Sequence, residues 1–117
     1  MGNVCNRMTF LQHYNEDEIR KIREKAIFEW KLFFPDVDMD IFISPILETV
    51  YNCYYSFVIS GDGSKYGWNA SDKADKFRKK FIDMIIKAHP GVDIVVLNIS
   101  EDLGAYIEYR FPDLPSL

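Results

Sequence analysis

The strongest constraint on the fold is a pair of amphipathic stretches, residues 15–34 and 71–89, each followed closely by a proline. Apolar side chains recur at helical spacing in both stretches: Ile19, Ile22, Ala26, Phe33 and Trp30 or Phe34 in the first, and Ala74, Phe77, Phe81, Ile85 and Ala88 in the second. Pro35 and Pro90 end the stretches, because the residue before a proline is pushed out of the helical region. The sequence therefore predicts two helices, each with one buried face.

Polar side chains at the start of each stretch support the same assignment. Asn15 and Glu18 form a capping pair for the first helix, and Ser71 or Asn69 is expected to cap the second. The capping side chains accept hydrogen bonds from backbone N–H groups that the first helical turn leaves unpaired.

The remaining segments have the patterns of strands. Residues 41–50 read as an extended segment that Pro45 interrupts, which is typical of an edge or bulged strand. Residues 52–60 and 105–111 alternate between the two faces, and residues 92–99 are almost continuously apolar. The order α-β-β-α-β-β predicts an α+β two-layer sandwich, a mainly antiparallel sheet with both helices on one face.

One predicted strand carries apolar side chains on both faces. Ile94 and Val96 have one parity, and Val95, Leu97 and Ile99 have the other. Only one parity can face the helices, so we expect the other to be covered by the N-terminal arm, by a second copy of the chain or by another protein, or shielded by the chain's own tail.

Length and composition indicate one domain spanning residues 1–117. Residues 1–14 are expected to form an arm or a short strand, and residues 112–117 a loose tail. With 48% hydrophobic residues the chain is not of the disordered class. It shows neither a membrane-spanning run nor a secretory signal, so a cytoplasmic location is expected, with no membrane partner.

The charge distribution points to a protein partner and away from direct nucleic-acid binding. The formal net charge is −4, the wrong sign for a generic nucleic-acid binder. Ten of the eighteen carboxylates lie outside the two predicted helices, where the cationic residues are only Arg7, Lys65 and Arg110. The strands and loops should therefore present an acidic surface that attracts a basic groove.

No constellation of residues indicates catalysis, a cofactor or a metal. His13 and His89 lack a second metal ligand at usable spacing, and neither forms a recognisable nucleophile pair with a serine or cysteine. Cys5 and Cys53 read as free thiols, Cys53 within a strand. The acidic run at residues 36–40 lacks the glycine and glutamate that a calcium loop needs. We expect a protein that is not an enzyme.

A glycine-rich segment, residues 61–71, lies between a predicted strand and the second helix. It fits neither a phosphate-binding P-loop nor a dinucleotide fingerprint. Three readings stay open: a structural connection, a protein-contact loop, and an anion site at the helix start with Lys65 nearby. We expect the ring of Trp68 to pack against the following helix or the end of the preceding strand.

The same region resembles a motif of small uncharacterised phage-encoded proteins. Residues 62–82 read Asp-Gly-Ser-Lys-Tyr-Gly-Trp and continue with Ser71, Asp75, Arg78 and Phe81-Ile82. The motif has Asp-Gly-Ser-Lys-Glu-Gly-Trp ahead of a helix with Asp-x-x-Arg-x-x-Phe-Ile, so Tyr66 replaces its glutamate. The resemblance covers about a fifth of the chain. It implies a phage or mobile-element context, in which small proteins that block host machinery, including anti-CRISPR proteins, are common.

These observations predict a non-catalytic binding protein that occludes a host protein or a protein–nucleic-acid complex, in the manner of a phage anti-defence inhibitor. The alternative is a homodimeric domain that binds a small ligand or an anion. The contact is expected to combine tyrosines with an acidic rim. The candidate binding residues are Tyr54, Lys65, Tyr66, Trp68, Tyr106, Asp36, Asp38 and Asp40.

Overall fold

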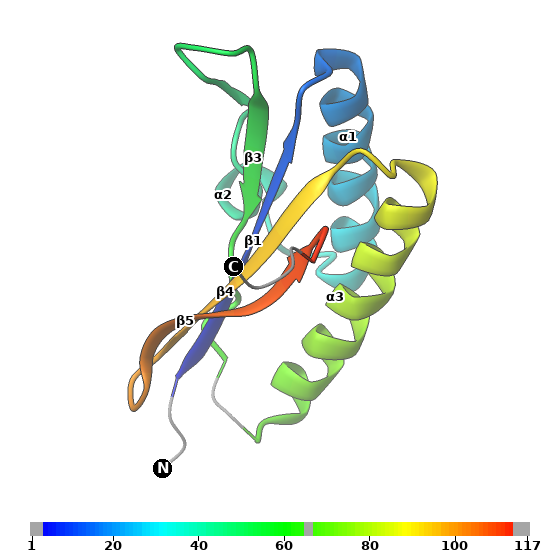
Figure 1. The fold of residues 1–117 in the computed structure, drawn as a ribbon. Helices are drawn as coiled ribbons and strands as arrows, with labels where there is room; N and C mark the ends of the chain where they lie inside the picture. The colour runs from blue at the N-terminus through cyan, green and yellow to red at the C-terminus, as the bar shows by residue number, and fades with distance from the viewer. Residues whose placement is uncertain (1–3, 65–66, 114–117) are drawn as a thin grey trace.

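The computed structural model describes residues 4–64 and 67–113. Within these residues the elements are β1 (Cys5–His13), α1 (Glu16–Phe33), α2 (Met39–Phe42), β2 (Leu47–Glu48), β3 (Tyr55–Ile59), α3 (Asn69–Ala88), β4 (Asp93–Ser100) and β5 (Gly104–Phe111). The strands form one antiparallel sheet in the order β2-β3-β1-β4-β5, and α1 and α3 lie side by side on one face of it (Figure 1). The predicted α+β two-layer sandwich is confirmed.

The segment expected as an arm or short strand is the central strand of the sheet. In β1, Thr9 lies between Ile59 of β3 and Val96 of β4. The side chains that β1 turns toward the helices are mostly polar and nevertheless buried: Cys5, Arg7, Thr9, Leu11 and His13. Three of these five are polar or charged, so the sequence lacks the apolar residue at every second position that would predict a buried strand.

The region between α1 and β3 departs from the predicted extended segment. Its first part is a single helical turn, α2, which Asp38 caps by accepting a hydrogen bond from the Asp40 N–H at 3.0 Å. Residues 52–54 were expected within a strand, but β3 begins only at Tyr55. Asn52 and Cys53 have positive φ angles of 67° and 49° and form the turn before it. Cys53 is therefore an exposed turn residue, and its prediction as a strand residue is wrong.

The cap of the first long helix is confirmed and that of the second is not. The Asn15 side chain accepts from the Glu18 N–H at 3.1 Å. In α3 the N-cap residue is Trp68, with no side-chain cap hydrogen bond, and Ser71 is buried in the first turn. Ser71 is thus a buried residue of the first turn and not the cap.

Trp30 of α1 is the centre of the hydrophobic core. Its side chain is buried and its ring lies within 4.6–6.4 Å, centroid to centroid, of five phenylalanine rings: Phe33, Phe34, Phe42, Phe77 and Phe81. These rings come from α1, the α1–α2 connection, α2 and α3. A single aromatic cluster therefore holds the helical layer together.

The two parities of β4 divide as its sequence pattern predicts. Ile94 and Val96 are buried beneath the helices. The other side of the sheet, called the open face here, carries Met8, Phe10, Val58, Val95, Leu97, Ile99 and Ile107 in neighbouring register positions. Among these, Phe10, Ile99 and Ile107 are exposed, with 60% of the Ile107 surface accessible. The open face is thus apolar although no element among the described residues covers it.

His13, at the end of β1, meets the ends of both long helices. The Asn15 N–H donates to His13 Nδ1 at 2.9 Å, and His89 Nδ1 lies 2.5 Å from a Glu18 carboxylate oxygen. Burial lowers the pKa of His13 more than the charges of Glu18 and Asp93 raise it, and His89 lowers it further. Since Nδ1 accepts a hydrogen bond, the folded state favours the neutral ring.

We therefore expect the protein to lose stability as the pH falls through about 6.5, the ordinary pKa of a histidine in an unfolded chain. The unfolded state binds the proton on His13 before the folded state does, so acid favours unfolding. His13→Asn keeps an acceptor near the position of Nδ1 but does not titrate, and should flatten this dependence. Melting temperatures of both proteins at about pH 7.5 and 5.5 provide the test. A slope that is unchanged in the variant would exclude His13 as its source.

Candidate functional site

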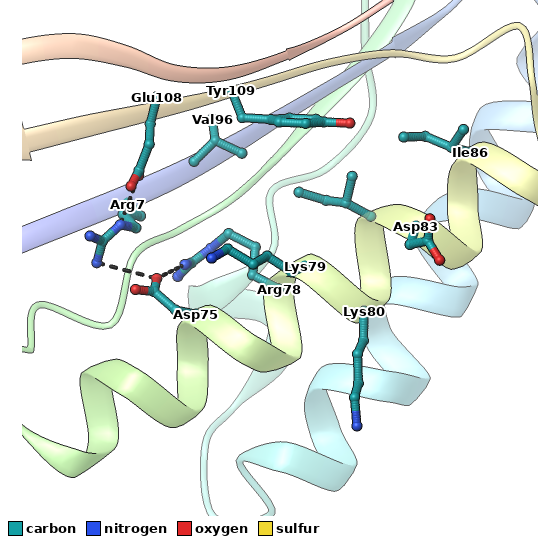
Figure 2. Close-up of a pocket in the computed structure, with 11 residues that line it drawn as sticks. Arg7, Asp75, Arg78, Lys79, Lys80, Asp83, Ile86, Val96, Glu108 and Tyr109 are labelled. Atoms are coloured by element: carbon teal, nitrogen blue, oxygen red, sulfur yellow. Dashed lines mark hydrogen bonds and ion pairs between the residues drawn. The ribbon is translucent and has the colours of Figure 1, made fainter.

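A cleft of about 650 Å³ lies between α3 and the β5 side of the sheet. Figure 2 shows its walls: Arg78 and Lys79 from α3 on one side, Glu108 and Tyr109 from β5 on the other, and Val96 of β4 beside Tyr109. Its volume is in the range of small-molecule sites. Because it is this large and is lined by both charged and apolar side chains, we treat it as the candidate site.

A β-bulge shapes the cleft. Leu97 pairs with Ile107 and Val96 pairs with Tyr109, so Glu108 has no partner on β4. This extra residue lets two consecutive side chains, Glu108 and Tyr109, point toward α3 (Figure 2). Without the bulge one of them would lie on the open face, because side chains alternate along a regular strand.

A cluster of four charged side chains occupies one end of the cleft. Arg7 Nε donates to Glu108 at 2.7 Å, and Arg7 Nη1 lies 3.2 Å from Asp75 Oδ1. The same oxygen accepts from Arg78 Nη1 at 2.6 Å. Both arginines are buried, with exposed fractions of 8% and 7%. One carboxylate oxygen therefore neutralises two desolvated guanidinium groups at once.

Arg7 keeps its charge in the folded state. Burial alone would lower the pKa of Arg7, but the hydrogen bond to Glu108 and the charges of Asp75 and Glu108 outweigh it, and the net shift raises that pKa. A cation that is held this firmly is suited to binding and orienting an anionic group, and unsuited to donating a proton.

The other end of the cleft is mostly apolar, with Asp83 among the residues that line it. Ile82 and Ile86 of α3 line it together with Val96 and the ring of Tyr109. The cleft thus has charged groups at one end and an apolar wall at the other. Sites that bind organic molecules usually have this composition. No group of three potential metal ligands is found among residues 4–64 and 67–113.

The structure does not gather the residues predicted as a binding site. Lys65 and Tyr66 lie outside the described residues, as do residues 114–117 of the expected tail. Tyr54 ends the turn between β2 and β3 at the top of Figure 1, whereas α3, with Trp68 at its N-cap, begins at the bottom. Trp68 is 51% exposed, so the expected packing of its ring is only partial.

The remaining predicted residues lie in two further places. Tyr106 is on β5, and its hydroxyl accepts from Asn98 Nδ2 at 3.0 Å on the helix side of the sheet. Asp36, Asp38 and Asp40 belong to α2 and the loop before it. Because Tyr106 faces the helices, the centre of the open face carries aliphatic side chains and one phenylalanine, and not the tyrosines expected at a contact surface.

The described part of the glycine-rich segment is tied to β1. A Cβ at Gly61 would lie 2.0 Å from Asn6 Oδ1, so only glycine fits against that strand. Asn6 Oδ1 accepts from the Gly63 N–H at 3.1 Å, and the carbonyl of Ser64 accepts from the Cys5 N–H at the same distance. These contacts support the hypothesis that the first half of the glycine-rich segment is a structural connection.

Sequence reasoning missed the four residues of the charged cluster. Asp75 and Arg78 are spaced i, i+3 on a helix, which is a weak signal in a helix rich in lysines. Arg7 and Glu108 are 101 positions apart and meet only through the register of β1, β4 and β5. The bulge that turns Tyr109 to the same side of the sheet as Glu108 leaves no mark in the alternation pattern.

Comparisons of the chain with protein-family models, curated proteins and solved structures gave no significant match. Among the described residues, no helix is both long and apolar enough to cross a membrane.

Proposed function

We propose that this chain is a non-catalytic protein-binding domain whose contact surface is the open face of its sheet. The observation that carries the proposal is the apolar character of that face. Antiparallel sheets of two-layer folds commonly present polar side chains to water on the side away from the helices. Here Phe10, Ile99 and Ile107 are exposed instead, next to the partly buried Val95 and Leu97. Contiguous apolar surface of this kind is typical of interaction sites.

A hollow in the same region supports the proposal. It has a volume of about 340 Å³ and is lined by Phe10, Val95, Asp93 and Arg110, among others. A partner side chain that fills such a hollow would act as an anchor, because interface energy concentrates where a few side chains are fully desolvated.

The charges around the face favour a basic partner over a second copy of the chain. The strands and turns of the sheet layer carry Glu48, Asp62, Asp93, Glu101, Asp102 and Asp113. Arg7 and Glu108 pair with each other on the helix side, which leaves Arg110 as the cation of this layer among the described residues. Two copies meeting through this face would bring like charges together, whereas a basic surface would be attracted. A nucleic-acid-binding groove of another protein has this character, and occluding it would inhibit that protein.

The resemblance of residues 62–82 to phage-encoded proteins supports the same reading. In that context the bound protein would belong to the host, and the domain would act as an anti-defence inhibitor of the anti-CRISPR or a related type.

Two lysine substitutions in exposed apolar positions test the proposal. Ile107→Lys places a charge on the open face, and Leu32→Lys places one at a similarly exposed site on α1. The wild type should retain a specific protein from a bacterial lysate, and that protein should elute as salt screens the acidic rim. Ile107→Lys should lose the protein and Leu32→Lys should keep it, as quantitative mass spectrometry would show.

Two results would contradict this proposal. Equal retention by both variants would place the contact elsewhere. Sedimentation velocity that shows a dimer in the wild type and a monomer in Ile107→Lys would assign the open face to self-association.

A further inference from the structure

The cleft between α3 and β5 has a surplus of positive charge once its ion pairs are counted. Arg7 and Arg78 are matched by Glu108 and Asp75. Asp83 at the other end of the cleft pairs with Lys87 at 2.9 Å. Figure 2 shows Lys79 extending beside Arg78; Lys80 also lines the cleft, but its side chain extends away from Arg78. Among the described residues, Lys79 therefore supplies a cation without a counter-charge inside this hollow.

The two buried arginines retain unused hydrogen-bond donors. A guanidinium group has five N–H donors. The contacts within the described residues use Nε and Nη1 of Arg7 and Nη1 of Arg78. The Nη2 groups remain, held in place by the ion pairs of their neighbours. Donors that are already oriented and partly desolvated bind an anion without the ordering cost that a flexible surface lysine incurs.

The shape of the site sets the rest of the ligand. The wall beyond the charges consists of Ile82, Ile86, Val96 and the ring of Tyr109, which together form an apolar slot next to the cationic end. An inorganic ion would leave this slot empty, and a neutral apolar molecule would leave the surplus charge unmatched. A molecule that satisfies both ends has one negative head and a flat apolar body.

We propose that this cleft binds a small organic monoanion, a carboxylate with an aryl-sized apolar body, with its head at Arg78 and Lys79 and its body against Tyr109. The site lies on the helix side of the sheet, so it is separate from the open face, and either proposal can fail without the other.

The test uses a panel of carboxylates and their matched alcohols. Benzoate, 4-phenylbutyrate and indole-3-acetate are titrated into the full chain, and benzyl alcohol, 4-phenylbutanol and tryptophol serve as neutral counterparts. Binding is followed by amide NMR shifts. At least one acid should saturate with a Kd of about 0.1–1 mM, since ligands of this size gain limited binding energy. The shifts should concentrate in α3 and β5, and the alcohol should bind more weakly.

Two neighbouring lysines provide the matched variants. Lys79→Met should weaken binding of that carboxylate about fivefold, because it removes a partly screened charge contact. Lys80→Met, one position along the helix with a side chain that extends away from Arg78, should change it less than about twofold. Tyr109→Ala should weaken it about tenfold through the loss of apolar contact. The fold of each variant is checked from its amide spectrum.

Three results would overturn the proposal. The first is that no acid in the panel saturates. The second is that acids and alcohols bind equally, which would leave the cleft as an apolar hollow without charge recognition. The third is that Lys79→Met and Lys80→Met behave alike.

Discussion

Replacing Trp30 by alanine should lower the free energy of unfolding by about 3–5 kcal/mol. The indole is buried at the centre of five phenylalanine rings from both long helices, α2 and the connection between α1 and α2. Its removal leaves a cavity where the two helices meet, and rings on separate elements cannot all move to fill it. Because a domain of this size is stable by only about 5–15 kcal/mol, a substantial part of the margin disappears. Urea denaturation followed by far-UV circular dichroism measures the loss.

Two further substitutions on α1 isolate the cause. Phe28→Ala removes an exposed ring from the same helix and should cost less than about 0.5 kcal/mol. Trp30→Phe keeps an aromatic ring and removes the indole N–H, which is buried without a hydrogen-bond partner among the described residues, so it should cost less than the alanine variant. A loss of less than about 1 kcal/mol for Trp30→Ala would show that this cluster does not hold the layer together.

The second large effect is expected at Asp75. Asp75→Asn should destabilise the protein by about 2–4 kcal/mol, because it removes the anion that two buried arginines share. An amide oxygen still accepts a hydrogen bond, but it leaves Arg7 and Arg78 with a single carboxylate between them, that of Glu108. Their mutual repulsion then adds to the cost of desolvation.

Asp83→Asn is the control for this prediction. It makes the same chemical change eight positions along the same helix, in an ion pair with Lys87 that is largely exposed. Exposed pairs of this kind contribute little, so the cost should be less than about 0.5 kcal/mol. Comparable losses for the two variants in urea denaturation would mean that the buried cluster adds nothing to stability beyond an ordinary surface pair.

The long helices could be predicted because their evidence is local. The apolar spacing of α1 and the pairing of Asn15 with Glu18 lie within a few turns of chain. The same holds for the end of α3, where Pro90 follows His89. The division of β4 into a helix-facing and an outward-facing parity was also readable, because both sets are apolar.

The sheet was harder to predict because burial and polarity disagree along it. Arg7 and His13 occupy inward positions of β1 that a pattern of apolar residues cannot identify. Each is tolerated because it has partners: Arg7 has two carboxylates, and His13 has a backbone N–H. At the other end of the sheet, Asn52 and Cys53 adopt positive φ angles that shorten the expected strand. Asparagine is enriched in that conformation and could have indicated a turn, but cysteine is not.

The candidate site could not be predicted from the sequence for a related reason. It depends on which residues of distant strands are neighbours, and on one irregularity in their pairing. If the register at the β4–β5 turn is continued without the bulge, Tyr109 falls opposite Val95 of the open face, so its place in the cleft cannot be predicted unless the bulge is known. The charged cluster is thus a property of the assembled sheet.

The central position of β1 also bears on the order in which the fold assembles. Cys5 pairs with Ser100, and Arg7 with Asn98, so β1 is synthesised well before β4, the strand that pairs with its second edge. During that interval α1 and the β2–β3 hairpin can form from local contacts, but the unpaired side of β1 remains available to other chains. Closure of the sheet requires a loop of nearly the whole domain, and topologies of this kind fold slowly. The polar side chains along β1, which obscure it in the sequence, also make it a poor template for aggregation while it waits.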